Sequence, residues 1–302
     1  IEILRNYFFK PLTWRIADPS YAGTAWSIKN LFELKHAKRV RFEGNILEHN
    51  WEHAQNGFSI LLTVRNQSGG NTWATVSDVT IRYNILRHVA QGINVLGKDD
   101  INTSDNSRRV LIRDNLLYDL GEYNTTSRRT FQYLNGSVDH TIDHNTTLYL
   151  SSGDHLILGE GGAGGPHTGW TCQNNLKERK SSGVVGSGQS DGDGTLNNAP
   201  FFTTPVYVAN AQIGGISGNY ATYPGNFFPA TRTAVGFVDN ANKDWHLAVA
   251  SSLNNAGNDG LDVGADIDTI ESAVTGAGYF GVTSGAQRAT DYETEWYAIT
   301  GA

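Results

Sequence analysis

The stretch Arg82-Tyr83-Asn84-Ile85-Leu86 decides the fold of this chain, because phrases of the same form return along much of the sequence. Each copy places an asparagine between two short segments that contain apolar residues, and the marked positions are Asn6, Asn45, Asn84, Asn115, Asn145 and Asn175. Consecutive marked asparagines are separated by 39, 39, 31, 30 and 30 residues. A repeat of a few tens of residues is typical of a solenoid.

The segments around each asparagine have the pattern of strands. Apolar and polar residues alternate before the asparagine, at residues 40–43, 79–82, 110–113 and 141–143. A second apolar run follows it, and a third comes after a polar or glycine-containing turn, at residues 58–64, 93–96, 131–134 and 156–158. Alternation with period two indicates half-buried strands, and the gaps are rich in Gly, Asn, Thr and Ser rather than in good helix formers. The pattern therefore predicts three strands per repeat and excludes helical repeats.

Three strands per coil, stacked coil on coil, make an all-β parallel β-helix. We expect the marked asparagines to sit at a tight bend between two strands, where they tolerate a left-handed backbone. Their amides could then hydrogen-bond to the asparagine of the coil above and below, which satisfies polar groups in the interior. A single asparagine would indicate only a turn, whereas six in register favour an interior ladder.

Composition narrows the class of protein further. The chain has 302 residues, a net charge of −7 and 18% charged residues, with no basic stripe, so nucleic acid is not the expected partner. Its apolar runs are too short to span a membrane. Cys172 is the single cysteine, and we expect it to be a buried, inert thiol. The chain starts at Ile1 without a methionine, so we expect a mature or truncated product of an exported protein.

Three regions are expected along the chain. Residues 1–186 carry the coils, residues 187–268 form degenerate last coils and an irregular C-terminal cap, and residues 269–302 form a tail or appended segment. A terminal repeat is atypical because it has to cover the open end of the stack. Residues 266–275 are expected to form a short helix.

Two features resemble a known group of proteins. The three-strand coils with an asparagine bend resemble the right-handed parallel β-helix proteins, the pectate-lyase-like superfold. The closing segment at residues 245–266, with Trp245-His246-Leu247 and Asp262-Val263-Gly264-Ala265-Asp266, resembles the end of many bacterial secreted β-helix-repeat proteins. The resemblance implies a right-handed coil and a secreted or cell-surface location. It does not single out one activity, because the superfold includes polysaccharide lyases, glycoside hydrolases, epimerases, phage tailspikes and adhesins.

In this superfold the ligand groove usually follows the third strand of the repeat and its flanking turns. Alternation points one set of side chains outward there, and neighbouring coils lie about 4.8 Å apart, so cations on three coils fall on one face within roughly 10 Å. The predicted catalytic residues are Lys35, Arg65, Lys98 and His155, and the predicted substrate-binding residues are Glu33, Asn94, Gln132 and Trp73. The alternative is that the charged residues form solvated ladders on a solenoid face.

These residue types suit an acidic polysaccharide. Cations neutralise a uronate carboxylate and acidify its α-proton, a basic side chain removes that proton, and a second group protonates the leaving oxygen. Paired carboxylates for hydrolysis are also open from the sequence. We expect either no cofactor or a calcium ion on Asp99 and Asp100, although acidic residues in polar loops are often only turn formers.

The sequence thus predicts a secreted protein that binds or acts on carbohydrate, most plausibly a lyase or hydrolase of an acidic polysaccharide. The rival prediction is a non-catalytic surface protein, adhesin or filament-forming protein. Self-association through open coil ends would suit the rival, since an uncovered edge of a stack of strands is a template for pairing.

Overall fold

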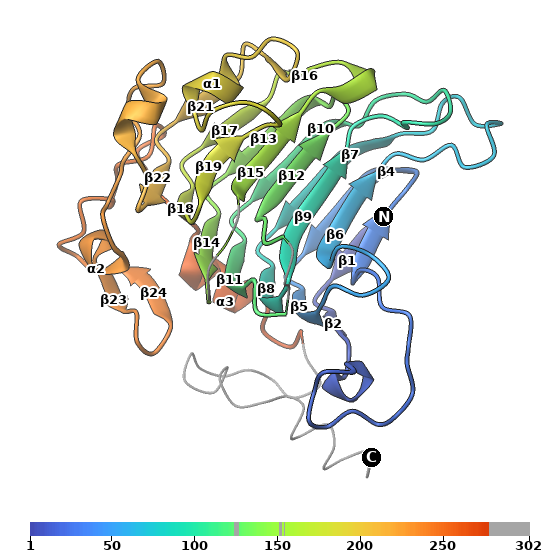
Figure 1. Ribbon diagram of the computed structural model, residues 1–302. Helices are drawn as coiled ribbons and strands as arrows, with labels where there is room; N and C mark the ends of the chain where they lie inside the picture. Colours follow the sequence, from blue (N-terminus) through green and yellow to red (C-terminus); the bar gives the residue numbers. More distant parts are fainter. Residues whose placement is uncertain (124–126, 151–152, 154, 278–302) are drawn as a thin grey trace.

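The computed structural model describes residues 1–123, 127–150, 153 and 155–277, and over these residues the chain is a parallel β-helix (Figure 1). Three parallel sheets run along the stack. Sheet A contains the strands that precede the marked asparagines: β1 (Glu2–Leu4), β4 (Ala37–Glu43), β7 (Val76–Arg82), β10 (Arg108–Arg113), β13 (Val138–Asp143), β16 (His167–Thr168), β17 (Thr171–Gln173), β20 (Phe202–Thr203) and β21 (Val206–Val208).

Sheets B and C complete each coil. Sheet B contains β2 (Tyr7–Phe9), β5 (Ile46–Asn50), β8 (Ile85–Val89), β11 (Leu116–Leu120), β14 (Thr146–Tyr149), β18 (Leu176–Glu178) and β22 (Ala211–Ile213). Sheet C contains β3 (Phe32–Leu34), β6 (Phe58–Thr63), β9 (Gln91–Leu96), β12 (Phe131–Leu134), β15 (His155–Glu160) and β19 (Ser182–Val185). The three-strand repeat and the all-β fold class predicted from the sequence are confirmed.

The interior is built from columns of side chains in register. One column from sheet A consists of Phe42, Ile81, Ile112, Ile142, Cys172 and Tyr207. One column from sheet B consists of Leu47, Leu86, Leu117, Thr147, Lys177 and Gln212. All of these residues are buried, and their apolar members belong to one continuous core. Cys172 is buried as predicted, but its neighbour is Lys177, whose Nζ donates to Sγ at 2.9 Å.

The asparagine ladder is present and longer than predicted. Asn84 donates its backbone N–H and its side-chain amide to Oδ1 of Asn115 at 3.0 and 2.9 Å, and Asn115 repeats both contacts to Asn145 at 3.1 and 2.9 Å. The ladder continues beyond Asn175 through Asn210 to Asn226. Each rung satisfies amides that would otherwise be buried without partners.

The left-handed residue of each bend is not the asparagine, which corrects the expected conformation. Positive φ angles occur one position earlier, at Arg5, Gly44, Tyr83, Asp114, His144, Asn174, Ala209 and Gly225. The turn is therefore made by the preceding residue, at the steric cost that a side chain carries in this region. The asparagine follows this left-handed residue, and its side-chain amide points along the stack toward the next coil.

The C-terminal region folds back along the outside of sheet B. It contains α2 (Arg232–Val235), the hairpin β23 (Phe237–Asp239) and β24 (Asp244–Leu247), and α3 (Ile267–Ala273). The short helix α1 (Asp193–Leu196) lies against β19 of sheet C and the 3-10 turn η3 (Ser217–Tyr220), and η1 (Leu12–Trp14) and η2 (Gly162–Gly164) are two further 3-10 turns. The helix predicted over residues 266–275 is present as α3, which Figure 1 shows beside β11 and β14.

A second apolar cluster holds this region in place. It joins outward residues of sheet B, such as Ile85 and Leu116, to Trp245, Val263 and Ile270. Gly44 shows how closely α3 approaches, because a Cβ there would lie 2.5 Å from the carbonyl oxygen of residue 273. The closing segment at residues 245–266 therefore packs on the side of several coils.

Two further predictions concern the chain as a whole. Within the described part of the chain, no helix combines the length and the apolar character needed to cross a bilayer. The predicted tail lies mostly outside the described residues, which end at 277.

Candidate functional site

The outer face of sheet C carries a column of mixed polar and aliphatic residues. The register of the strands aligns Glu33, Leu61, Asn94, Gln132, Leu158 and Val185 on successive coils. The side-chain N–H of Gln132 donates to Oδ1 of Asn94 at 2.8 Å, and Arg129 donates to Oε1, the side-chain oxygen of Gln132. Two neighbouring amides are thus fixed in one orientation on the floor of this face.

A pocket of about 280 Å³ lies over these amides. Its lining consists of Ala54, Gln55, Asn56, Phe58, Leu61, Asn94 and Gln132. The loop at residues 51–57, between β5 and β6, supplies one wall. Asn94 and Gln132 keep only 9% and 8% of their surface exposed, so a ligand would reach them through the pocket. We call this the amide pocket.

A second pocket, of about 230 Å³, lies beyond the ends of the same strands and is lined by Lys35, Arg65, Gln67, Asp99, Ile101 and Asn102. We call it the Lys35 pocket. The structure therefore brings two of the predicted cations, Lys35 and Arg65, to one depression. Lys98 does not line it, although the next residue, Asp99, does.

Arg65 is not an isolated cation. Its Nη1 contacts Oδ1 of Asp99 at 3.3 Å and also contacts Oδ1 of Asp100. Lys35, in contrast, makes no side-chain hydrogen bond or ion pair within the described residues. The positive charge open to a ligand in the Lys35 pocket is therefore that of Lys35.

Asp99 organises the loop that follows β9. Its side chain is 1% exposed, and its two oxygens accept backbone N–H groups of Asn66 at 2.5 Å, Ile101 at 2.9 Å and Asn102 at 3.3 Å. Burial alone would raise the pKa of Asp99, but these donors and the nearby Arg65 outweigh it and hold the pKa below its usual range.

These contacts bear on the predicted calcium site. Calcium needs carboxylate and carbonyl oxygens with free lone pairs. Both oxygens of Asp99 already accept N–H donors, and Asp100 contacts Arg65, so this pair does not fit a cation as it stands. Across the residues that the structure describes, no cluster of three or more His, Cys, Asp or Glu side chains has an arrangement for a metal ion.

The remaining predicted residues lie apart from one another. His155 begins β15 and hydrogen-bonds through Nδ1 to Oγ of Ser182 on the next coil, at 2.5 Å. Glu33 accepts a hydrogen bond from Oγ1 of Thr63 at 3.1 Å. Trp73 lies in the loop between β6 and β7 and is 58% exposed. The amide pocket therefore contains Asn94 and Gln132, and the Lys35 pocket contains Lys35 and Arg65. Of the two predicted metal ligands, Asp99 lines the Lys35 pocket and Asp100 does not.

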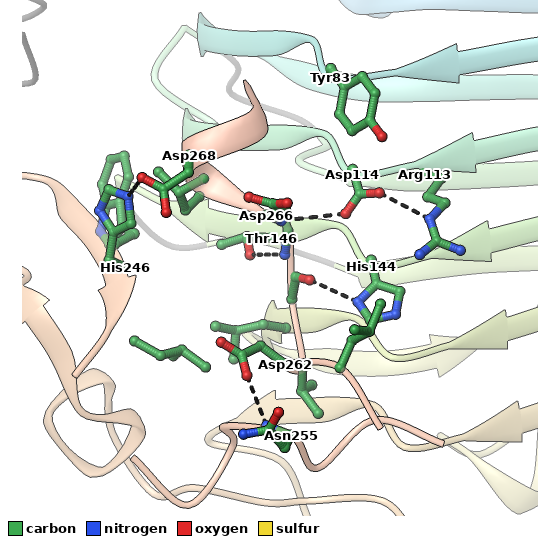
Figure 2. A pocket seen from close by; sticks show the side chains of 18 residues that line it. Tyr83, Arg113, Asp114, His144, Thr146, His246, Asn255, Asp262, Asp266 and Asp268 are labelled. Carbon is green, nitrogen blue, oxygen red and sulfur yellow. Dashed lines mark hydrogen bonds and ion pairs between the residues drawn. The ribbon is translucent and has the colours of Figure 1, made fainter. Parts of the chain in front are cut away.

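A larger cavity, of about 610 Å³, lies between sheet B and the C-terminal segment (Figure 2). Its charged groups are paired: Arg113 contacts Asp114 at 2.9 Å, His144 donates from Nε2 to Oδ2 of Asp259 at 2.9 Å, and His246 lies 3.3 Å from Asp268. Burial raises the pKa of Asp114. The His144–Asp259 contact and the backbone N–H groups of Ala265 and Asp266, which donate to Thr146 and Asp114, attach the segment to the coils, so the cavity has a structural explanation. It was missed from the sequence because its two walls are more than a hundred residues apart.

Comparison of the chain with models of protein families, with curated proteins and with solved structures finds no match. The site is therefore interpreted from its geometry.

Proposed function

We propose that the protein binds an acidic polysaccharide across the outer face of sheet C. The observation that carries this proposal is the amide pocket, where Asn94 and Gln132 are fixed in line and flanked by the apolar Leu61. Amides donate and accept hydrogen bonds in one plane, which matches the mixed donor and acceptor character of sugar hydroxyls. The aliphatic neighbour offers contact to the less polar face of a sugar ring.

The Lys35 pocket supplies the preference for an acid. It lies past the ends of β6 and β9, so a polysaccharide that follows the strand direction from the amide pocket reaches it. Lys35 would pair there with a carboxylate, and Arg65, already bonded to two aspartates, would add hydrogen bonds rather than net charge. Binding of this kind is common to the enzyme and to the non-catalytic surface protein expected from the sequence.

β-Elimination is a second candidate function for the same face. It is favoured because Lys35 and Arg65 line one pocket, where Arg65 could orient a uronate carboxylate and Lys35 could take the α-proton. Incubation with a panel of uronate polysaccharides, followed by the absorbance of an unsaturated product, tests it. Product formation that is lost in Lys35→Ala supports the lyase. Absence of product with binding intact leaves a non-catalytic binder.

The binding proposal is tested with variants that the stack itself supplies. Leu61 and Leu158 occupy the same column as Asn94 and Gln132, so Asn94→Leu with Gln132→Leu keeps side-chain size and strand register. We expect binding of uronate oligosaccharides to fall about tenfold or more, because several hydrogen bonds of about 1 kcal/mol each are lost. The matched control is Thr141→Leu on sheet A, which copies the leucine one coil earlier. Equal binding by the double variant and the control would refute the proposal.

A further inference from the structure

The loop at residues 51–57 separates the amide pocket from another pocket that the sequence did not indicate. Residues 54–56 wall the amide pocket, while Trp51, Glu52 and His53 line a pocket of about 260 Å³ on the other side. Trp14, Arg15, Ile16, Ala17 and Tyr123 complete this lining. We call it the aromatic pocket.

Its surface is rich in ring faces. Trp51 is buried and meets Tyr123 edge to face, with ring centroids 6.5 Å apart. Trp14 belongs to η1 and packs against Trp26 at 5.5 Å, and Trp26 is itself 50% exposed. Ile16 is 57% exposed. Of the rings that line the pocket, those of Trp14 and Tyr123 are only partly buried, and they offer a stacking surface for a ring with one apolar face.

The pocket also contains a positive charge of a different kind from that of Arg65. The Arg15 guanidinium lies 4.8 Å from the centre of the Tyr123 ring. Within the described residues its side chain makes no hydrogen bond or ion pair. Its five N–H donors are therefore open to an anion, and a carboxylate is the partner that a guanidinium binds through two parallel hydrogen bonds.

The three pockets follow the chain order around β6. Residues 51–53 line the aromatic pocket, residues 54–61 the amide pocket, and residues 65 and 67 the Lys35 pocket. β6 is extended and spans roughly 20 Å at about 3.3 Å per residue, so it sets the order of the amide pocket and the Lys35 pocket in space. The aromatic pocket lies before β6, at the loop of residues 51–57 whose later residues wall the amide pocket. A ligand long enough to occupy more than one pocket would run parallel to the strands, along the course of a coil.

We propose that the aromatic pocket is a distinct subsite for a uronate residue, with the sugar ring against Trp14 and its carboxylate on Arg15. This inference rests on the proposed function, and it specifies the substrate as a polymer with carboxylates on residues that lie apart along the chain. It also assigns the path of the polymer, from the aromatic pocket over the loop at residues 51–57 to the amide pocket.

The experiment compares short and long uronate oligosaccharides by calorimetric titration of the full chain. For long oligomers, Trp14→Ala should weaken binding about three- to tenfold through loss of ring contact, and Arg15→Gln about tenfold or more through loss of a charge-assisted contact. Trp14→Phe keeps a ring face and should bind nearly as the wild type does. Disaccharides that fill only the amide pocket should not distinguish these variants from the wild type. Unchanged urea unfolding of each variant shows that the fold is kept.

The possible failures are distinguishable. If the wild type binds long oligomers and both Trp14→Ala and Arg15→Gln bind them equally well, the aromatic subsite is refuted while the proposed function stands. If Trp14→Phe loses as much affinity as Trp14→Ala, ring stacking is refuted. If the wild type binds no oligomer, the proposed function fails and this inference fails with it.

Discussion

Replacement of Asn115 by alanine is the sharpest perturbation of the ladder. The Asn115 side chain is fully buried and takes part in five hydrogen bonds. Its amide donates to the carbonyl oxygens of Ile81 and Arg113 at 2.9 and 3.0 Å and to Oδ1 of Asn145 at 2.9 Å. Its Oδ1 accepts from the backbone and side chain of Asn84 at 3.0 and 2.9 Å.

The expected loss follows from this count. At about 1 kcal/mol net for each bond, Asn115→Ala should lower the free energy of unfolding by about 3–5 kcal/mol, the lower value applying where Asn84 and Asn145 keep other partners. The buried N–H of Asn84 loses its acceptor outright. Urea unfolding followed by circular dichroism measures the global effect, and native-state hydrogen exchange at the Asn84 amide measures the local one.

Asn6 provides the control, because it occupies the same ladder at its exposed end. Its side-chain amide donates to Leu4 and Asn45 at 3.1 and 3.0 Å, and both bonds are partly open to solvent. Asn6→Ala should therefore cost about 1 kcal/mol or less. If the two variants lose equal stability, or if exchange of the Asn84 amide does not accelerate in Asn115→Ala, the ladder does not stabilise the coils as described.

Three further predictions concern buried charge. Cys172→Ile with Lys177→Leu restores the residue types of earlier coils and should raise stability by about 1–4 kcal/mol in urea unfolding, because a buried polar pair is replaced by apolar side chains of similar size. Burial lowers the pKa of Lys177 and raises the pKa of Cys172. Below about pH 8 the thiol is protonated in both states, so only Lys177 contributes: the folded state binds fewer protons than the unfolded state, and wild-type stability should fall as pH drops, a slope that the double variant should lose. Arg87→Leu alone should cost about 3–5 kcal/mol, because the buried Glu48 carboxylate loses its guanidinium partner at 2.9 Å and is left with the Tyr7 hydroxyl at 2.6 Å and His49 at 3.6 Å; adding Glu48→Leu should recover most of the loss. The pKa of Asp99 lies below its usual range, so its contribution is complete above about pH 4 and is lost as pH falls through the folded pKa; Asp99→Ala should lower stability near neutral pH and remove this acid dependence.

The sequence was sufficient for the fold because one residue type recurred at one structural position. Every marked asparagine makes the contact to the next coil that its spacing predicts. Asn210 and Asn226 were missed because their spacing of 35 and 16 residues departs from the repeat. The conformation of the bend was also wrong by one residue, since the tolerance of asparagine for left-handed backbone applied equally to the glycine, aspartate or histidine before it.

The candidate site was less predictable than the fold. Strand alternation correctly placed Asn94 and Gln132 on the outer face, because period two fixes which side of a sheet a residue occupies. It could not show that Arg65 is bonded to Asp99 and Asp100, which depends on the path of a loop. Nor could it bring Arg15 next to Tyr123, which lies on a loop three coils along the chain.

The most direct test of the central claim follows the side-chain amide signals of Asn94 and Gln132 by nuclear magnetic resonance while a uronate oligosaccharide is added. The two signals are identified by their loss in Asn94→Leu and Gln132→Leu, and the buried amide of Asn115 serves as an internal reference. The account predicts that both signals shift with saturation while the Asn115 signal stays in place. Saturation of the protein with ligand while the signals of Asn94 and Gln132 remain unmoved would contradict it.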